Sequence, residues 1–385
     1  GNNIRATISN TGTFFKYAET GIGSGYESPK DSGNHLIFGH NFWFAGVDTD
    51  GVLRVAATGF RPENRDIYSG PLQVDGGAEP PAVPFAEEVY IVSKSEIDFH
   101  IYNHAAPGYV MPHGIENWPG NGDVDLGLAE TLAPFHDFNE NGLYEPETGD
   151  FPLIRGDYAA YLIMNDNGGE HHGTGGEPLG IEMHYMFYQY ETEDEHINNA
   201  TFIHAKVINR GTNDFSDFRV GSYMDFDIGD PQDDFIGTYP AHNLLYAYNG
   251  DAHDGVSPYG PGYGFDPPAV GLMSLNNRMS VGGYYANLGG VYRDPLVDIE
   301  YWHYLNARWI TGEHFKYKET DIDTNFMFNG YPSEDDPDEW TEISQGNPPG
   351  DRRCFMGLES VALAPGEEKC FDFAVITFSG TENHI

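Results

Sequence analysis

Four consecutive runs of strand-type sequence between residues 159 and 229 constrain the fold most. They are AAYLIMND, IEMHYMFYQYE, ATFIHAKVIN and FRVGSYMDFDIG, and several alternate apolar with polar positions, as strands do. From Met183 to Tyr190 both alternating sets are largely apolar or aromatic, so both faces of this strand are expected to be covered. The pattern predicts a strand in the centre of a sheet that is buried on its two sides.

Other strand-type runs surround these four. VALA and FDFAVITF are expected to close the chain as a hairpin around PGE. With 14% aromatic residues, 48 glycines and 25 prolines, the composition favours many short strands with long loops. We therefore predict a mainly β fold of one or more antiparallel β-sandwiches, with long Gly/Pro-rich loops and little helix. Weaker strands are expected at 242–248, 281–286, 303–310 and 324–329.

Two local elements are expected in the first third of the chain. The runs LIFGHNFWFAGV and VLRVAATGF flank DTDG at 48–51, a turn signal between apolar strands, which predicts a hairpin. The segment from Ser95 to Ile101 begins with a capping serine and early acidic residues, which predicts a short helix.

The pattern of residue types along the chain changes near residue 150. Regular strand patterns follow that point, whereas Gly/Pro-rich stretches with little periodicity precede it. We therefore predict a loop-rich N-terminal β region over 1–150 and a β-sandwich domain over 151–385. A surface loop is expected where prolines gather, at positions 62, 71, 80, 81 and 84.

The stretch 136–157, HDFNENGLYEPETGDFPLIRGD, spaces its oxygen-bearing side chains like a calcium loop. Such loops place ligands at positions 1, 3 and 5, a glycine at 6 and a backbone carbonyl at 7. Position 12 is Thr148 instead of a bidentate Glu, so another acid would have to complete the shell. The alternative is a turn whose Asx side chains bind only backbone amides. The predicted ligands are Asp137, Asn139, Asn141, Leu143 through its carbonyl, Glu145, Glu147 and Asp150.

Pro134 and Pro152 disfavour helices on the two sides of this stretch. We therefore expect a loop that calcium pins between the two parts of the chain, and not a regulatory helix–loop–helix unit.

A second acidic group follows the last of the four runs. On a strand, Asp225 and Asp227 project to the same face, where two carboxylates repel each other unless a cation lies between them or one is protonated. Together with nearby loop acids they predict a second calcium site. The alternatives are a solvated loop, or a carboxylate pair that hydrolyses a glycosidic bond. The predicted residues are Asp225, Asp227, Asp230, Asp233 and Asp234.

Charge and length exclude several classes of partner. Sixty acidic residues against 19 basic ones give a formal net charge of −41, which repels nucleic acid and anionic membranes. Direct membrane insertion is not expected, because no run approaches the roughly 18 apolar residues that a spanning helix needs. The first residue is Gly1 and no leader-type segment follows it, which favours a mature, processed form.

Few residue types suggest covalent chemistry. Cys354 and Cys370 could form one disulfide or be two small core residues, and the sequence leaves both open. We recognise no nucleophile or metal motif such as G-x-S-x-G, H-E-x-x-H or C-x-x-C. The protein is therefore not expected to be an enzyme. Scattered aromatic residues such as Trp302 and Trp309 could stack on sugars, although core packing is their commoner use.

Several stretches, in order along most of the chain, resemble a group of large secreted Bacteroidota proteins exported by the type IX secretion pathway. They include NNIRATISNTG, FWFAGVDTDGVLRVAATGFRPEN, APFHDFNENGLYEPETGDFPLIRGD and YMDFDIGDPQDDFIG. The resemblance implies an extracellular or cell-surface β-protein that carries calcium, usually followed by further domains and a C-terminal sorting domain.

These observations favour a secreted, calcium-stabilised structural or adhesive surface protein that assembles with copies of itself into a filament or layer. A protein that stays monomeric by light scattering in calcium would contradict the self-assembly. The alternatives are a calcium-dependent module that binds extracellular glycans and, third, a carboxylate-dependent glycoside hydrolase. Unchanged activity in an Asp227→Asn variant would remove the third.

Overall fold

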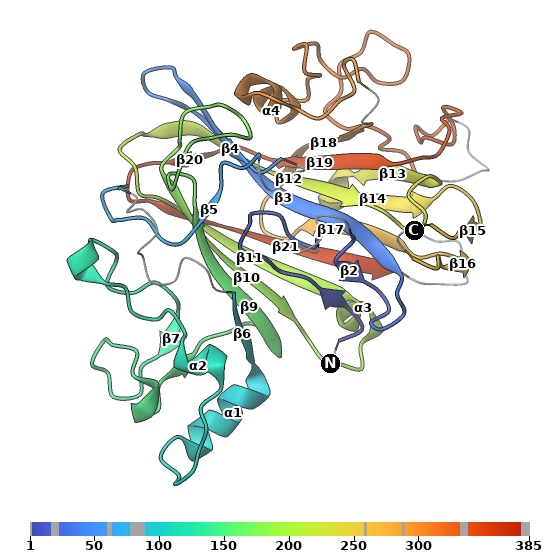
Figure 1. Ribbon diagram of the computed structural model, residues 1–385. Coiled ribbons are helices and arrows are strands. Elements are labelled where there is room, and N and C mark those ends of the chain that lie inside the picture. Colours follow the sequence, from blue (N-terminus) through green and yellow to red (C-terminus); the bar gives the residue numbers. More distant parts are fainter. Residues whose placement is uncertain are drawn as a thin grey trace.

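Two antiparallel sheets packed face to face form the body of the protein (Figure 1). The computed structural model describes residues 2–16, 23–59, 64–77, 89–257, 260–286, 289–331 and 338–378. The predicted loop prolines at 62, 80, 81 and 84 lie outside these ranges. The mainly β, sandwich-type fold with little helix is confirmed.

The first sheet has eight strands. In spatial order they are β1 (Arg5–Ala6), β2 (Tyr26–Glu27), β3 (His35–Asp48), β12 (Phe215–Phe226), β19 (Arg352–Leu358) and β18 (Met279–Tyr285), with β4 (Leu53–Ala57) beside β3 and β20 (Val361–Leu363) beside β12.

The second sheet has nine strands. They are β13 (Asp234–Tyr239), β14 (Leu244–Asn249), β17 (Ala269–Ser274), β21 (Glu368–Phe378), β11 (Ala200–Asn209), β10 (Ile181–Gln189), β9 (Tyr158–Asn165) and β5 (Tyr68–Ser69), with β6 (Tyr90–Ser93) also beside β9. Strands from before residue 150 thus pair with later strands in both sheets.

Small elements complete the chain. Two separate strand pairs are β7 (Phe135–His136) with β8 (Phe151–Pro152), and β15 (His253–Asp254) with β16 (Gly264–Phe265). The helices are α1 (Lys94–Asn103), α2 (His113–Glu116), α3 (Glu195–Asn198) and α4 (Asp298–Tyr304), and the 3-10 turns are η1 (Val124–Leu126), η2 (Pro146–Thr148) and η3 (Pro240–His242).

Because side chains alternate along the strands, they pack both between the two sheets and on the outer face of the second sheet. Between the sheets, the ring of Phe42 stacks on Tyr185 at 5.3 Å and contacts Phe373 at 5.4 Å. The outer face of β9 and β10 is covered by the segment that carries α1 and α2, through residues such as Tyr161 and Tyr188. β10 therefore lies between two strands and is buried on both faces, as predicted.

The hairpin of β3 and β4 and the helix α1 confirm the local predictions, with one correction. The helix is capped by Ser93 and not by Ser95, since the Ser93 side chain accepts from the Glu96 backbone N–H, and Glu96 in turn accepts from Ser93.

Of the four weaker strand predictions, 242–248 and 281–286 are confirmed by β14 and β18, and the other two are wrong. The predicted strand 303–310 begins in the last two residues of α4 and contains only an isolated bridge at Arg308. Tyr301 and Tyr304, three residues apart, both pack inward on one face of this helix. Within the described residues, 324–329 form only an isolated bridge at Phe326. VALA and FDFAVITF are not a hairpin, because β20 pairs with β12 in one sheet and β21 with β11 and β17 in the other.

Candidate functional site

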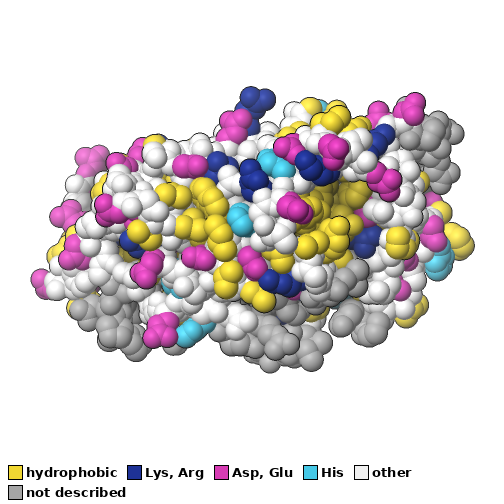
Figure 2. All heavy atoms as spheres, turned by 90° about the horizontal axis from the view of Figure 1, so that it is seen from above, with side chains coloured by type: hydrophobic (Ala, Val, Ile, Leu, Met, Phe, Trp, Pro, Cys, Tyr) yellow, Lys and Arg dark blue, Asp and Glu magenta, His cyan; other side chains and the backbone are white. Residues whose placement is uncertain are grey.

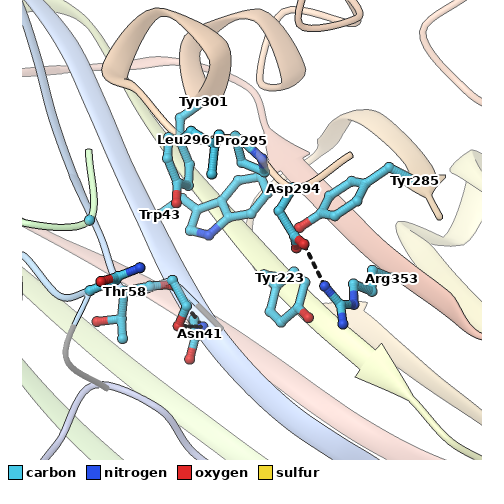
Figure 3. Close-up of a pocket in the computed structure, with 13 residues that line it drawn as sticks. Asn41, Trp43, Thr58, Tyr223, Tyr285, Asp294, Pro295, Leu296, Tyr301 and Arg353 are labelled. Atoms are coloured by element: carbon cyan, nitrogen blue, oxygen red, sulfur yellow. Dashed lines mark hydrogen bonds and ion pairs between the residues drawn. The ribbon is translucent and has the colours of Figure 1, made fainter. Parts of the chain in front are cut away.

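A pocket of about 270 Å³ lies on the outer face of the first sheet, beside α4 (Figure 3). Neighbouring strands supply its floor: Asn41 of β3 is opposite Tyr223 of β12, and Arg353 of β19 is opposite Tyr285 of β18. Side chains of one face recur every second residue, so Trp43 follows Asn41 into the same pocket. The rest of the lining is Thr58, Gly59, Asn64, Gly173, Asp294, Pro295, Leu296 and Tyr301.

Four aromatic rings, all buried, form the apolar wall of the pocket. The Trp43 ring lies nearly parallel to Tyr223, with centroids 6.0 Å apart, and meets Tyr301 of α4 edge-on at 5.0 Å. Tyr223 in turn stacks at 6.3 Å with Tyr285. Burial raises the pKa of Tyr223 and of Tyr285 well above the ordinary value, so these phenols stay protonated at neutral pH. Figure 2 shows hydrophobic side chains gathered in the middle of this face, with charged side chains around them.

Polar groups line two sides of the same pocket. Arg353 donates to Asp294 at 2.5 Å, which closes one side (Figure 3). On the other side, the Asn41 amide donates to the Thr58 carbonyl at 2.9 Å. Two residues of the lining, Asn41 and Thr58, each carry a buried side-chain oxygen without a hydrogen-bond partner, whereas the Tyr223 hydroxyl is hydrogen-bonded to Asp225. Because buried polar atoms are nearly always paired, the two oxygens call for a ligand or water.

An acidic trio, Asp225, Asp227 and Asp351, lies beside the pocket on the same sheet face. One carboxylate oxygen of each lies within 4.8 Å of those of the other two. The Arg353 guanidinium, 4.0 Å from Asp225, is shared between this trio and the pocket. Burial, opposed by Arg353 and reinforced by Asp351, raises the pKa of Asp225 to about 7. Burial and then Asp225 raise the pKa of Asp227 well above its ordinary value.

The predicted second acidic group is thus divided. Asp225 and Asp227 do share a face, and within the described residues their carboxylate oxygens lie together with one of Asp351, while Asp234 at the start of β13 acts on Asp227 through its charge. The Asp234 carboxylate accepts from the Ile228 backbone N–H at 2.9 Å. The backbone of Asp230 donates to Asp254, and Asp254 and Asp230 together raise the pKa of Asp233, after burial, to about 6.

In the predicted calcium loop, the side chains of Asp137 and Asn139 accept hydrogen bonds from backbone N–H groups, as in the Asx turns of the alternative. The Asp137 carboxylate accepts from the backbone N–H groups of Asn141 and Gly142, at 3.2 and 2.6 Å. These hydrogen bonds hold the pKa of Asp137 below its ordinary value, although burial opposes this. Asn139 Oδ1 accepts from Asn141 at 3.0 Å, and the Asn141 amide donates to Glu145 at 2.6 Å. Carboxylate and amide oxygens keep lone pairs beyond such bonds, so Asx turns and a cation are compatible.

The remaining predicted ligands of this loop differ in burial and in their hydrogen bonds. Asp150 is fully buried, and its two oxygens accept from the backbone of Phe138 and Glu145 at 2.8 and 2.7 Å. Asp150 therefore holds the loop together through hydrogen bonds to two backbone N–H groups. Glu147 lies in η2 and is exposed, and Leu143 is exposed with its N–H bonded to Asn141 Oδ1.

Other predicted features lie away from the pocket. Trp302 lies under the Arg219 guanidinium, and Trp309 packs edge-on against Tyr292, so neither ring belongs to the pocket lining. Cys354 is buried in the first sheet and Cys370 is exposed in the second, and both thiols are free.

Sequence reasoning missed Trp43, Arg353 and Asp351, although part of the signal was present. Trp43 lies in a predicted strand, but alternation alone does not tell which face packs on the second sheet. Asp351 is 126 residues from Asp225, and only the β12–β19 register brings them together.

Comparisons with known proteins give no family. No family model and no curated protein matches the chain. Within the described residues, no helix is long and apolar enough to cross a membrane. Among solved structures, the chain is similar to a crystal structure described as "Putative aldose 1-epimerase" from Escherichia coli K12, at 10% identity and a TM-score of 0.25, over 99% of this chain and 100% of that chain. At this TM-score the likeness says nothing about function.

Proposed function

We propose that this protein is an extracellular, calcium-stabilised β-sandwich that binds a neutral sugar unit in the pocket of the first sheet. One observation carries the proposal: Asn41 and Thr58, which line one pocket, each carry a buried side-chain oxygen with no hydrogen-bond partner. A sugar hydroxyl both donates and accepts, so adjacent hydroxyls can satisfy an amide oxygen and a threonine hydroxyl at once. The Trp43 and Tyr223 rings supply apolar surface for the C–H face of the same ligand.

Charge selects against anionic ligands. Asp294 is the acidic residue among the lining residues, and the Arg353 guanidinium is bonded to it at 2.5 Å. The acidic trio beside the pocket adds negative charge, as does the net charge of −41. A phosphate or carboxylate ligand would therefore be repelled, whereas a neutral polyol would not.

Binding fits this pocket better than hydrolysis does. Glycoside hydrolysis ordinarily uses two carboxylates on opposite sides of the scissile bond. Among the described lining residues Asp294 alone offers one, and it is held by Arg353. A sugar-binding pocket would also serve the adhesive surface role that the sequence favours, with the glycans of another surface as the partner.

Tyr223→Phe tests the pocket, because Tyr223 belongs to its lining. Removing a hydroxyl that is hydrogen-bonded to the buried Asp225 carboxyl should lower the unfolding free energy by about 1 kcal/mol. Losing the hydroxyl as an acceptor for the ligand should weaken sugar binding about tenfold. Glycan-array screening followed by calorimetry with neutral monosaccharides measures binding, and thermal melting measures stability.

Tyr246→Phe is the matched control, since Tyr246 is a buried tyrosine of β14 in the other sheet. It should leave sugar affinity unchanged. If the wild-type protein binds no neutral sugar on the array or in calorimetry with calcium present, the proposed function is wrong. Equal affinity for the Tyr223→Phe variant and the wild type would remove the pocket as the binding site.

A further inference from the structure

We propose that His171 carries a proton on both ring nitrogens, and that this buried cation positions one rim of the pocket. His171 lies in the loop between β9 and β10, beside β4, and its side chain is 1% exposed. Four acceptor groups face the ring, two of them backbone carbonyls and two of them carboxylates. The carbonyls indicate the protonation state, and the carboxylates connect the ring to the pocket.

Both ring nitrogens of His171 face an atom that can only accept a hydrogen bond. Nδ1 lies 2.9 Å from the carbonyl oxygen of Val55, and Nε2 lies 2.6 Å from the carbonyl oxygen of Asp166. A neutral imidazole carries a single N–H, so its second nitrogen would turn a lone pair towards a carbonyl lone pair. In a buried site the unpaired nitrogen and the unpaired carbonyl would both destabilise the fold. The geometry therefore requires two N–H groups, which makes the ring an imidazolium.

Two fully buried carboxylates balance the charge of this ring. Asp66 has Oδ2 3.7 Å from Nδ1, and Asp166 has Oδ2 4.0 Å from Nε2. Among the described residues, His171 is the one basic side chain within 4.0 Å of either carboxylate. Both carboxylates also accept from backbone N–H groups, which favours their ionised form. Burial raises the pKa of Asp166, and the His171 ring is the first of the groups that oppose this. Two buried anions with no cation between them would be strongly destabilising.

The other charged side chains on the elements around the ring lie on the surface or have partners of their own. They are Glu170, His172 and Glu177 in the same loop, Arg54 of β4, Arg65 next to Asp66, and Asp298 of α4. Arg54 is bonded to Asp48 at 2.8 Å, and the Arg65 guanidinium lies over the ring of Tyr68. The three acids and bases of the loop are exposed. The charge of the buried ring is therefore balanced by Asp66 and Asp166.

Asp66 connects the charged ring to the pocket. Its Oδ1 accepts from the N–H of Gly173 at 2.7 Å, and its Oδ2 accepts from the N–H of Ala57 at 3.1 Å. Gly173 lines the pocket, and Ala57 ends β4 directly before Thr58, which lies in the pocket wall in Figure 3. A Cβ on Gly173 would come within 2.8 Å of the Asn64 carbonyl oxygen, so the two segments of this rim are in close contact. One carboxylate thus holds both segments, and the ring balances its charge.

The charge on His171 should make the rim sensitive to pH. Above about pH 6.5 an exposed histidine is mainly neutral, whereas the folded protein keeps the second proton. The stability that this proton supplies is therefore complete in weak acid and declines as the pH rises. Loss of the proton would leave Asp66 without its balancing charge and would loosen the segment that carries Thr58, one of the two residues with an unpaired oxygen in the pocket. This last step rests on the proposed function, but the protonation state and the position of the rim do not.

NMR of the wild-type protein with 15N-labelled histidine rings tests the protonation state without any sugar. At about pH 7.5 we expect both ring nitrogens of His171 to give protonated signals, assigned from their contacts with Val55 and from their loss in His171→Gln. His172→Gln is the matched control, since His172 is the exposed neighbour, and it should remove a different signal. A His171 ring with one unprotonated nitrogen at this pH overturns the inference.

Backbone amide NMR of the same proteins, again without sugar, tests the position of the rim. The signals of Gly59 and Gly173, which both line the pocket, should shift in His171→Gln and stay in place in His172→Gln. If they stay in place in His171→Gln as well, the ring does not position the rim and the inference is wrong.

Melting temperature and sugar affinity show whether the charge of the ring is what matters. In weak acid His171→Gln should melt about 5 °C below the wild type, and this difference should follow the fraction of doubly protonated ring across a pH series. A difference that does not follow this fraction would mean that the ring acts through packing alone, and would also overturn the inference. Calorimetry should show sugar binding about tenfold weaker in His171→Gln than in His172→Gln. A wild type that binds no neutral sugar overturns the proposed function, while the NMR results still decide the role of His171.

Discussion

Replacing Trp43 with Ala is expected to lower the unfolding free energy by about 3–5 kcal/mol, the range for removing a large buried aromatic side chain. Trp43 is 2% exposed and contacts rings from three other elements. It lies nearly parallel to Phe355 of β19 at 6.1 Å and to Tyr223, and it meets Tyr301 of α4 edge-on. The substitution would leave a cavity between the sheet and the helix that covers it.

The same substitution should abolish measurable sugar binding. Trp43 forms part of the pocket wall. It also packs against α4, the helix that follows the lining segment 294–296. Loss of the ring would therefore remove both an aromatic contact with the ligand and the support of the Asp294 side of the pocket. Chemical denaturation gives the stability change, and calorimetry with the sugar identified for the wild type gives the affinity.

Trp302→Ala is the control for this experiment. Trp302 is the next residue after Tyr301 on α4, but it is half-buried and lies under Arg219, away from the pocket. It should cost clearly less stability than Trp43→Ala and leave sugar affinity unchanged. If Trp43→Ala retains wild-type affinity in a folded protein, the pocket is not the sugar site.

The strand content could be predicted because periodicity and burial agree over long runs. The four runs between 159 and 229 became β9, β10, β11 and β12, since apolar and aromatic residues are dense there and several of the runs alternate apolar with polar positions. The failures were short aromatic runs. The predicted strand at 303–310 overlaps the end of α4, where packing of Tyr301 and Tyr304 on the first sheet decides for a helix.

The candidate site could be predicted only in part, for a different reason. Asp225 and Asp227 are two residues apart, so strand geometry alone places them together. Asp351, Arg353 and Trp43 come from strands that are neighbours only through register and sheet order. Such long-range pairing is not encoded in local spacing, and this is why Asp351 was not predicted beside Asp225 and Asp227.

A second buried polar network lies on the outer face of the other sheet, beneath the segment with α1 and α2. Glu182 accepts from the Leu72 backbone at 2.7 Å, from His184 at 2.8 Å and from Arg210 at 2.9 Å. The Tyr161 hydroxyl is bonded to the other ring nitrogen of His184 at 2.6 Å. The network thus joins β9, β10 and two connecting segments, with Glu182 fully buried at its centre.

Glu182→Gln is expected to lower the unfolding free energy by about 3–5 kcal/mol at pH 7. The substitution removes the carboxylate charge and leaves the buried groups that are bonded to it without compensation. Burial opposes the charge on Glu182, but His184 and Arg210 hold its pKa at about 2. The stability that the ionised Glu182 contributes is fully present above pH 4.5, its ordinary pKa, and is lost as the pH falls from 4.5 through 2. Burial lowers the pKa of His184 from 6.5, so stability also declines below that pH.

The wild type should therefore lose stability in two overlapping stages on acidification, and Glu182→Gln should lack the stage between pH 4.5 and 2. Denaturation curves at a series of pH values measure both stages. Glu368→Gln is the control, since Glu368 is largely exposed and 3.8 Å from Lys206 in the same sheet, and it should change stability by less than about 1 kcal/mol. If Glu182→Gln behaves like this control, the network supplies packing alone and its charges contribute nothing to the acid response.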